Sequence, residues 1–213
     1  MWNPATLTLL AITDALRGKD GTGPEARDDL VARAAAAVRG GATMIQLRLK
    51  DADARTQVEV ARALIAALPP TVPVIVNDRA DVALAAGAAG VHLGADDLPV
   101  AAVRRIAPPG FIIGASVGND AEVAGSRGAD YVGIGPVYGT ASKADAGDAI
   151  GTAELARLAA RCALPAVAIG GIDTTNAAAV MATGVCGVAV IRAVFSAPDP
   201  EAAARALRSA IGR

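Results

Sequence analysis

The sequence predicts a single (β/α)8 TIM barrel, and three observations lead to that fold class. The chain has 213 residues, which is near the lower limit of about 200 residues for such barrels and leaves no room for a second domain. Eight short apolar runs alternate along the chain with Ala-rich segments of helical spacing. Strict alternation of strand and helix indicates a parallel sheet. We therefore expect one domain over residues 1–213.

Each expected strand is a short run rich in apolar and β-branched residues. In chain order these runs are Leu7–Thr13, Met44–Leu49, Val74–Asn77, Gly90–Leu93, Ile112–Ser116, Tyr131–Val137, Ala166–Ile169 and Val188–Ala193. The clearest helical spacing between them falls at Asp28–Arg39, Ala54–Leu68, Val100–Ile106 and Thr152–Cys162. Several strands are apolar throughout, which is typical of parallel strands covered by helices on one face and by packed side chains on the other.

An open, doubly wound sheet is the alternative fold. A dinucleotide-binding sheet of that kind carries G-x-G-x-x-G after its first strand, and no such motif follows Leu7–Thr13. The strand count therefore favours the barrel. Two long, polar, Gly-rich connections, Asp14–Glu25 and Gly139–Ile150, have the length of lids or binding loops.

Composition excludes several classes of partner. Hydrophobic residues make up 53% of the chain and aromatic residues only 2%, which suits buried parallel strands and leaves few rings for base stacking. The formal net charge is −1 and the cations are spread singly, so we expect no nucleic acid and no membrane as a partner. The composition leaves the oligomeric state open, a homo-oligomer included.

The start of the chain and its cysteines indicate a cytoplasmic protein. Met1-Trp2-Asn3-Pro4 lacks the basic segment of a secretory signal, and no run of about 18 uncharged apolar residues occurs. Cys162 and Cys186 lack the close spacing of a metal or redox motif. We expect them to be reduced thiols packed as small hydrophobic side chains.

The end of the second expected strand concentrates positive charge. In such barrels the active site lies at the carboxyl ends of the strands. Strand alternation puts Gln46, Arg48 and Lys50 on one face. Unpaired cations are costly in a buried strand, so this face needs an anion, either a ligand or carboxylates of the barrel. A structural ion-pair network is the alternative interpretation.

Carboxylates follow the next two strands. Asp78 ends the third strand, while Asp96 and Asp97 come shortly after the fourth. Such carboxylates can pair with the cations or hold Mg²⁺ against a bound phosphate, and hard oxygen ligands favour Mg²⁺ over zinc. Asp96 can equally cap the following helix. His92, within the fourth strand, is expected to be a packed, hydrogen-bonded core residue, and no Ser-His-Asp or Cys-His arrangement is apparent.

The later strands add hydroxyls, a lysine and a glycine pair. Ser116 ends the fifth strand, and the connection after the sixth contains Thr140, Ser142 and Lys143. Gly170-Gly171 follows the seventh strand, where backbone N–H groups without neighbouring side chains can approach an oxyanion closely. Barrels commonly bind phosphate after strands seven and eight, so we expect a phosphorylated small molecule near Gly171 and Ile191.

Taken together, these motifs closely resemble the thiamine phosphate synthase family and its thiazole tautomerase relatives. The matching motifs are Gln46-x-Arg48-x-Lys50, Val76-Asn77-Asp78, His92-Leu93-Gly94-x-x-Asp97, Gly114-x-Ser116, Gly133-x-Gly135-Pro136, Thr140-x-Ser142-Lys143 and Gly170-Gly171-Ile172. The resemblance spans nearly the whole chain. It implies a transferase in thiamine biosynthesis that joins hydroxymethylpyrimidine diphosphate to a thiazole phosphate or carboxylate, with Mg²⁺ as cofactor, and releases pyrophosphate.

The resemblance also implies a role for each matching residue. Asp78 and Asp97 would bind Mg²⁺, and Gln46 would orient the pyrimidine. The residues that would hold the diphosphate are Arg48, Lys50, Asn77 and Lys143. Ser116 would hydrogen-bond near the pyrimidine or the leaving group. By this resemblance Lys143, Ser116 and Arg48 would take part in catalysis.

The thiazole side follows from the same resemblance. Thr140, Ser142 and the backbone at Gly171 and Ile191 would place the thiazole phosphate. The connection Gly139–Ile150 would close and keep water from the pyrimidine-methyl cation that forms when pyrophosphate departs. That chemistry depends on positioning and charge stabilisation and requires no general base.

Some residues depart from the family pattern. Leu49 stands where an acidic residue is frequent, and Gly118 replaces a frequent histidine. Ala189 and Arg192 occupy positions where small hydroxyl residues are common. The missing histidine argues more strongly against a tautomerase than against a synthase, because the resemblance assigns the tautomerase's proton shuttle to it. A tautomerase-like protein and a non-catalytic phosphate-binding barrel are the alternatives.

Overall fold

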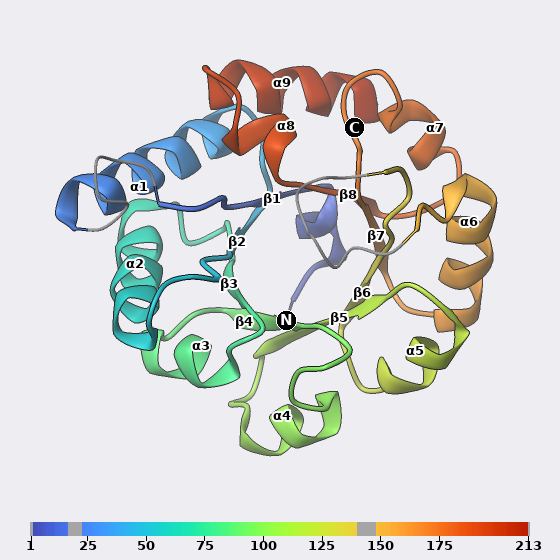
Figure 1. The fold of residues 1–213 in the computed structure, drawn as a ribbon, viewed down its shortest axis with the longest axis horizontal. Coiled ribbons are helices and arrows are strands. Elements are labelled where there is room, and N and C mark those ends of the chain that lie inside the picture. Colours follow the sequence, from blue (N-terminus) through green and yellow to red (C-terminus); the bar gives the residue numbers. More distant parts are fainter. Residues whose placement is uncertain (1, 17–22, 140–147, 213) are drawn as a thin grey trace.

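The computed structural model describes residues 2–16, 23–139 and 148–212 of the chain. Its centre is a closed barrel in which all neighbouring strands are parallel and lie in sequence order from β1 to β8 (Figure 1). The ring closes because Leu9, Leu10 and Ala11 of the first strand pair with residues 188–190 of the last. The predicted barrel fold is confirmed, and the open-sheet alternative is excluded.

The strands are four residues long except β5, which has six. They are β1 (Leu9–Ile12), β2 (Met44–Leu47), β3 (Val74–Asn77), β4 (Gly90–Leu93), β5 (Ile112–Val117), β6 (Tyr131–Ile134), β7 (Ala166–Ile169) and β8 (Gly187–Val190). β3, β4 and β7 have the predicted bounds. The last strand was predicted to continue to Ala193, but it ends at Val190 and the chain turns into a short helix.

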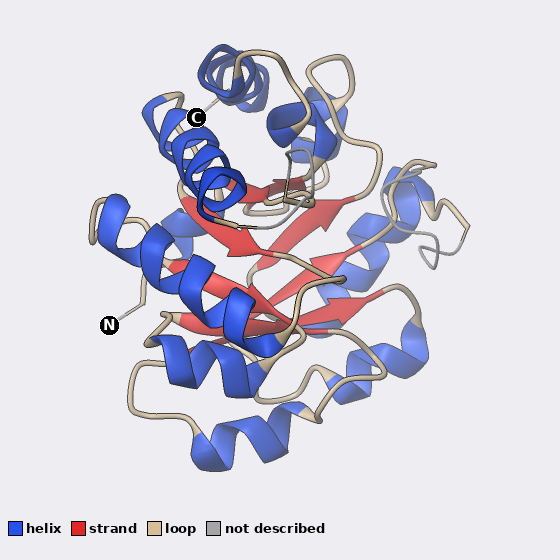
Figure 2. Cartoon of the chain, turned by 60° about the vertical axis from the view of Figure 1, so that its left-hand side comes forward, coloured by secondary structure: helices blue, strands red, loops and turns tan. Residues whose placement is uncertain are grey.

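The helices form the outer ring that Figure 1 shows around the barrel. In chain order the structure has η1 (Pro4–Leu7), α1 (Pro24–Arg39), α2 (Ala54–Ala67), α3 (Ala80–Ala86), α4 (Val100–Ile106), α5 (Asp120–Gly125), α6 (Gly151–Cys162), α7 (Ala177–Met181), α8 (Arg192–Phe195) and α9 (Pro200–Ile211). The side view in Figure 2 shows the helices lying outside the strands. The short α8 stands between β8 and the outer helix α9, so the last strand is followed by an additional element.

Local sequence signals account for several helix starts. The Asp53 carboxylate accepts a hydrogen bond from the Thr56 amide at 2.8 Å and caps α2, and Asp199 caps α9 in the same way. Asn119 caps α5 through hydrogen bonds from the amides of Ala121 and Glu122. These caps satisfy amides that have no partner within the helix and so define where each helix begins.

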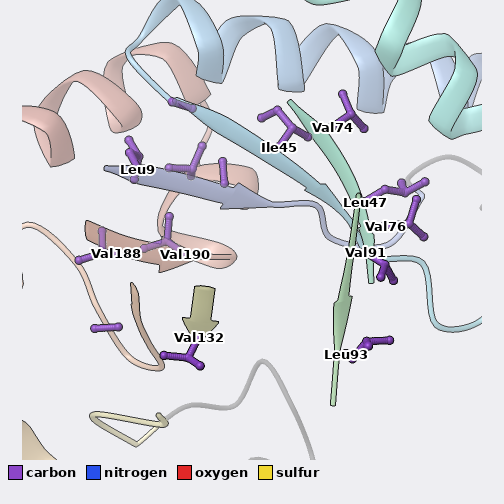
Figure 3. Close-up of a cluster of buried hydrophobic side chains, with 14 of the residues drawn as sticks. Leu9, Ile45, Leu47, Val74, Val76, Val91, Leu93, Val132, Val188 and Val190 are labelled. Atoms are coloured by element: carbon purple, nitrogen blue, oxygen red, sulfur yellow. The ribbon is translucent and has the colours of Figure 1, made fainter. Parts of the chain in front are cut away.

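Two apolar layers hold the barrel together. Outward side chains such as Leu9, Ile45 and Val91 belong to one large buried cluster (Figure 3). Leu30, Leu64 and other helix residues belong to the same cluster. A second cluster fills the barrel interior and includes Leu10, Met44, Ile75, Tyr131 and Val167. Residues of adjacent strand positions thus alternate between the two layers, as strand geometry requires.

The N-terminal segment covers the amino-terminal end of the barrel. Leu7 is buried in the interior cluster, and Trp2 packs against it with its ring centre 6.2 Å from that of Tyr131. In Figure 1 the N-terminus lies in the middle of the ring. The opposite, carboxyl-terminal end of the barrel therefore provides the open mouth. Across residues 2–16, 23–139 and 148–212, no helix is both long enough and apolar enough to cross a membrane.

Candidate active site

A cavity of about 1100 Å³ opens at the carboxyl ends of the strands. Its lining includes Asn77 at the end of β3, Ser116 in β5, Gly171 after β7 and Ile191 after β8. Lys50, which follows β2, also lines it. Side chains that are far apart in the sequence therefore meet in one mouth, where an active site of this fold is expected.

Gln46 and Asn77 form a buried amide pair beneath the cavity. The Gln46 side-chain amide donates a hydrogen bond of 2.6 Å to the Asn77 side-chain oxygen. Gln46 is 3% exposed and Asn77 is 8% exposed. Asn77 lines the cavity, whereas Gln46 lies one strand away behind it. Gln46 therefore acts on the cavity through the orientation of the Asn77 amide.

Arg48 and Lys50 differ in position. Lys50 is exposed and lines the cavity, but Arg48 is absent from the described lining. The backbone of Arg48 is tied to β1 because its amide donates to the Thr13 hydroxyl at 2.8 Å and its carbonyl accepts from that hydroxyl at 3.2 Å. The buried Nε of Arg48 has no hydrogen-bond partner among the described residues. The residue as a whole is partly buried, and no ion pair joins it to a carboxylate of the described residues.

Asp78 and Asp97 both line the cavity, and each is positioned by a different backbone feature. Asp78 has a φ of 64° and its amide donates to the His92 carbonyl at 2.8 Å. Such a φ is uncommon for a residue with a side chain and turns the chain sharply after β3. One Asp97 oxygen, Oδ2, accepts a hydrogen bond of 2.7 Å from the Gly94 amide, which fixes the loop after β4.

Asp96 also lines the cavity and is exposed. The N-cap of the following helix α4 is Pro99, so Asp96 does not cap that helix. The capping alternative is wrong because the chain runs three residues further before α4 begins.

His92 is a packed core residue in the structure. It is 8% exposed, with Nδ1 at 3.0 Å from the Tyr131 hydroxyl and Nε2 at 3.0 Å from the Ser116 hydroxyl. Burial raises the pKa of Tyr131. Ser116 in turn lines the cavity, so the buried histidine contacts a residue of the candidate site.

The loops after β7 and β8 form the other side of the mouth. Gly170 and Gly171 have φ values of 102° and 63°, and a Cβ on Gly170 would lie 2.6 Å from Cα of Pro136. Only glycine fits such a turn without strain. Ile191 and Arg192 line the cavity where α8 begins. This arrangement of glycine turn and short helix matches the phosphate sites of many barrels.

Several polar residues of the lining were not predicted. Glu122 accepts a hydrogen bond from the Gly118 amide and another from the Asn119 side chain, both at 2.7 Å. The spacing N-x-x-E at the start of α5 is the signature of a capping box and could have indicated this contact. Asp148 and Asp173 line the cavity as well. The Thr175 hydroxyl and amide hold the pKa of Asp173 below its ordinary value.

Carboxylates outnumber cations in the described lining. The carboxylates are Asp78, Asp96, Asp97, Glu122, Asp148 and Asp173, and the cations are Lys50 and Arg192. Thr140, Ser142 and Lys143, which were predicted to bind substrate, lie outside the described residues. The described part of the mouth on its own would repel an anion unless further positive charge accompanied it.

Comparisons with known proteins agree with the resemblance. A family model described as thiamine monophosphate synthase matches residues 20–194. The chain is 49% identical to a thiamine-phosphate synthase from Xanthobacter autotrophicus over 99% of this chain and 98% of the relative. It is 50% identical to a thiamine-phosphate synthase from Methanoculleus marisnigri, with 95% and 94% covered.

Solved structures agree in fold. Thiamine phosphate pyrophosphorylase from Pyrococcus furiosus superposes with a TM-score of 0.84 at 38% identity and covers 98% of this chain and 97% of its own. A 3-hexulose-6-phosphate synthase, at 20% identity and a TM-score of 0.71, shares the fold alone. On the family match and these identities, the chain is a transferase of thiamine biosynthesis and belongs to the thiamine monophosphate synthase family.

Proposed function

We propose that this chain joins hydroxymethylpyrimidine diphosphate to a thiazole phosphate in a Mg²⁺-dependent reaction that gives thiamine phosphate and pyrophosphate. The observation that supports this proposal best is the meeting of Lys50, Asn77, Asp78, Asp97 and Ser116 in one cavity. A diphosphate leaving group needs charge neutralisation and oriented hydrogen-bond donors, and these residue types provide both.

The donor set fits Mg²⁺. Asp78 and Asp97 offer hard carboxylate oxygens. Residues 2–16, 23–139 and 148–212 contain no group of three or more Asp, Glu, His or Cys side chains that could hold a metal ion by themselves. Mg²⁺ is usually bound by one or two carboxylates together with waters and substrate phosphates, so two carboxylates suffice. A carboxylate has about four lone-pair directions, and the Gly94 amide uses one of those of Asp97. When bound, the ion would supply positive charge against the diphosphate.

The excess of carboxylates in the described lining also supports a metal. A diphosphate approaching these side chains meets negative charge from several directions, and its affinity would be low in isolation. An accompanying divalent cation reverses the sign of that interaction. We therefore expect diphosphate binding and metal binding to depend on each other.

The protein's own groups bind and orient the two substrates. Lys50 donates to the diphosphate, and Asn77, oriented by Gln46, donates to the same group. We propose that Arg48, Thr140, Ser142 and Lys143 complete the substrate contacts, with Arg48 and Lys143 acting on the leaving group. Departure of pyrophosphate leaves a pyrimidine-methyl cation that the thiazole nitrogen traps, so the enzyme contributes mainly positioning and electrostatic stabilisation.

The thiazole phosphate is proposed to bind at the Gly170-Gly171 turn. Both glycines line the cavity and have positive φ values, and neither carries a side chain that would keep an anion from its backbone amide. Ile191 contributes its backbone and Arg192 a charge on the facing loop. Substrates bound at the two ends of the mouth would meet near Ser116.

The test measures pyrophosphate release with each substrate alone, with both, and with both plus a chelator. Release is expected only with both substrates and Mg²⁺. Asp97→Ala should abolish turnover, whereas the matched control Asp28→Ala, an exposed carboxylate on α1 outside the cavity, should retain it. Full activity of Asp97→Ala would contradict the metal assignment. Calorimetric binding of a thiazole phosphate but not of the diphosphate, with or without Mg²⁺, would instead indicate a non-catalytic phosphate-binding barrel.

A further inference from the structure

A chain of side-chain hydrogen bonds runs from the barrel interior to the cavity. The Tyr131 hydroxyl lies 3.0 Å from Nδ1 of His92, and Nε2 of His92 lies 3.0 Å from the Ser116 hydroxyl. Tyr131 is fully buried, whereas Ser116 lines the cavity. A phenol that no substrate can reach is therefore connected through one imidazole to a hydroxyl that a substrate can contact.

The neighbouring strands leave space for this chain. A Cβ on Gly114 would lie 2.3 Å from Cζ of Tyr131 and 2.5 Å from Nδ1 of His92. A Cβ on Gly133 would lie 3.0 Å from Cε1 of His92. Gly114 is paired with both His92 and Tyr131 in the strand register. The absence of side chains at these two positions on adjacent strands thus leaves room for the two rings to make the hydrogen bond.

The Tyr131 hydroxyl determines the direction of the hydrogen bonds. Burial raises its pKa, so the hydroxyl keeps its proton. Within the described part of the chain, His92 is the hydrogen-bond partner of this hydroxyl, and no other is found. A buried donor without an acceptor loses its solvation with no compensation, so the Tyr131 proton is directed at Nδ1.

The remaining steps follow from the inventory of donors and acceptors. A neutral imidazole that accepts at Nδ1 carries its proton on Nε2. Nε2 then donates to the Ser116 oxygen. A serine hydroxyl has one proton and two lone pairs, so the Ser116 proton is left to be donated into the cavity.

We propose that His92 is a positioning residue whose tautomer, set by Tyr131, makes Ser116 a hydrogen-bond donor toward the substrate. The substrate atom would be an acceptor, either a ring nitrogen of the pyrimidine or an oxygen of the diphosphate. This inference rests on the proposed function for the identity of the substrate, but the tautomer itself is a property of the free protein.

The tautomer can be measured directly because His92 is the only histidine of the chain. Protein labelled with ¹⁵N-histidine, without substrate and at neutral pH, is examined by long-range ¹H–¹⁵N correlation NMR. We expect a protonated Nε2 and an unprotonated Nδ1. Tyr131→Phe should remove the preference and give a mixture of tautomers. A protonated Nδ1 in the wild-type protein, whether neutral or as imidazolium, overturns the proposal.

Kinetics test whether His92 acts through Ser116. Loss of one oriented donor typically lowers kcat on the order of 10²-fold, and we expect this for Ser116→Ala. His92→Asn retains a polar group near Nδ1 but none near Nε2, and should lower kcat by about the same factor. His92→Gln, which retains a polar group near Nε2, should recover about tenfold or more of that loss.

The double variant separates a positioning role from a purely structural one. If His92 acts through Ser116, adding His92→Asn to Ser116→Ala should lower kcat no further. Additive losses, equal kcat values for the Asn and Gln variants, or unchanged kcat in Ser116→Ala overturn the proposal. Circular dichroism is used to verify that each variant is folded. Absence of turnover by the wild-type protein contradicts the proposed function alone, because the NMR measurement uses no substrate.

Discussion

The side-chain amide of Gln46 donates to the side-chain oxygen of Asn77 across the boundary between β2 and β3, at 2.6 Å and almost without exposure to solvent. The pair links a residue behind the cavity wall to a residue in it. Both the stability of the barrel mouth and the orientation of the Asn77 amide depend on this contact.

Replacing Gln46 by Ala should therefore affect stability and catalysis together. A buried acceptor left without its donor costs about 1–3 kcal/mol, and urea unfolding should show a loss of that size. The control is Gln57→Ala, a buried glutamine of α2 whose amide donates to the Ala52 carbonyl away from the cavity. It should lose similar stability while kcat stays unchanged. Unchanged kcat in Gln46→Ala would contradict a role in orienting Asn77.

Gly114 lies so close to the rings of Tyr131 and His92 that we expect no larger residue to fit at this position. Gly114→Ala places a methyl group within 2.5 Å of three ring atoms of Tyr131 and His92, and overpacking of this kind costs about 1–3 kcal/mol. Gly125 in α5 has no atom within 4 Å of a Cβ position, so Gly125→Ala should be neutral or slightly stabilising. Thermal unfolding of both variants checks the difference. Equal melting temperatures would show that the strands shift to accommodate the methyl group.

Arg192 supplies one of the two cations of the described lining and lies beside the proposed phosphate site. Arg192→Ala should raise KM for the thiazole phosphate by about tenfold, equivalent to about 1.4 kcal/mol, with little change in kcat. Arg127→Ala removes an exposed arginine that does not line the cavity and should change neither constant. Steady-state kinetics with varied thiazole phosphate distinguishes the two. An unaltered KM in Arg192→Ala would mean that this side chain points away from the phosphate.

Glu122 should hold the loop after β5 through its hydrogen bonds from Gly118 and Asn119. Glu122→Ala releases the Gly118 amide, two residues after Ser116, so we expect a loss of about 1 kcal/mol in stability and a lower kcat. Glu59→Ala, an exposed substitution on α2, is the control and should change neither. The prediction fails if kcat for Glu122→Ala equals that of the wild type.

Acid should weaken the ion pairs between α5 and α6. The Arg157 guanidinium holds the pKa of Asp120 below its ordinary value of 3.8. A carboxyl whose pKa is lower in the folded state stabilises the fold above its unfolded pKa and loses that contribution as the pH falls through its folded pKa. In melting curves from neutral pH downward, Asp120→Asn should therefore differ from the wild type near pH 7 and converge with it as the pH falls below the ordinary carboxyl pKa of 3.8. A constant difference at all pH values would exclude this linkage.

The sequence was sufficient to predict the barrel and those residues of the site that lie at the ends of strands. Alternation of apolar runs and helical segments predicted the fold, and the bounds of β3, β4 and β7 agree because each run ends at a polar or glycine residue. Asp78, Asp97 and Ser116 reach the cavity because they lie at or shortly after the carboxyl ends of parallel strands, and those ends meet.

Other features depend on contacts that a single sequence does not reveal. The last strand was predicted to continue through Ile191, Arg192 and Ala193, yet it ends at Val190 and the chain forms α8. Strand alternation placed Arg48 beside Lys50, but the regular strand ends at Leu47, so the alternation no longer governs where these side chains point. The contact between His92 and Tyr131 joins residues 39 positions apart and follows from strand register, which the pattern of apolar residues does not specify.

The pairing of β1 with β8 has a consequence for synthesis on the ribosome. β1 is made before the other strands of the barrel, but one of its edges finds its partner only when residues 187–190 have been made. At about 5–20 residues per second, that edge waits roughly 10–35 s with its amides and carbonyls unpaired. Until then the nascent chain presents a template to which a strand of another polypeptide can add, and ring closure removes that template.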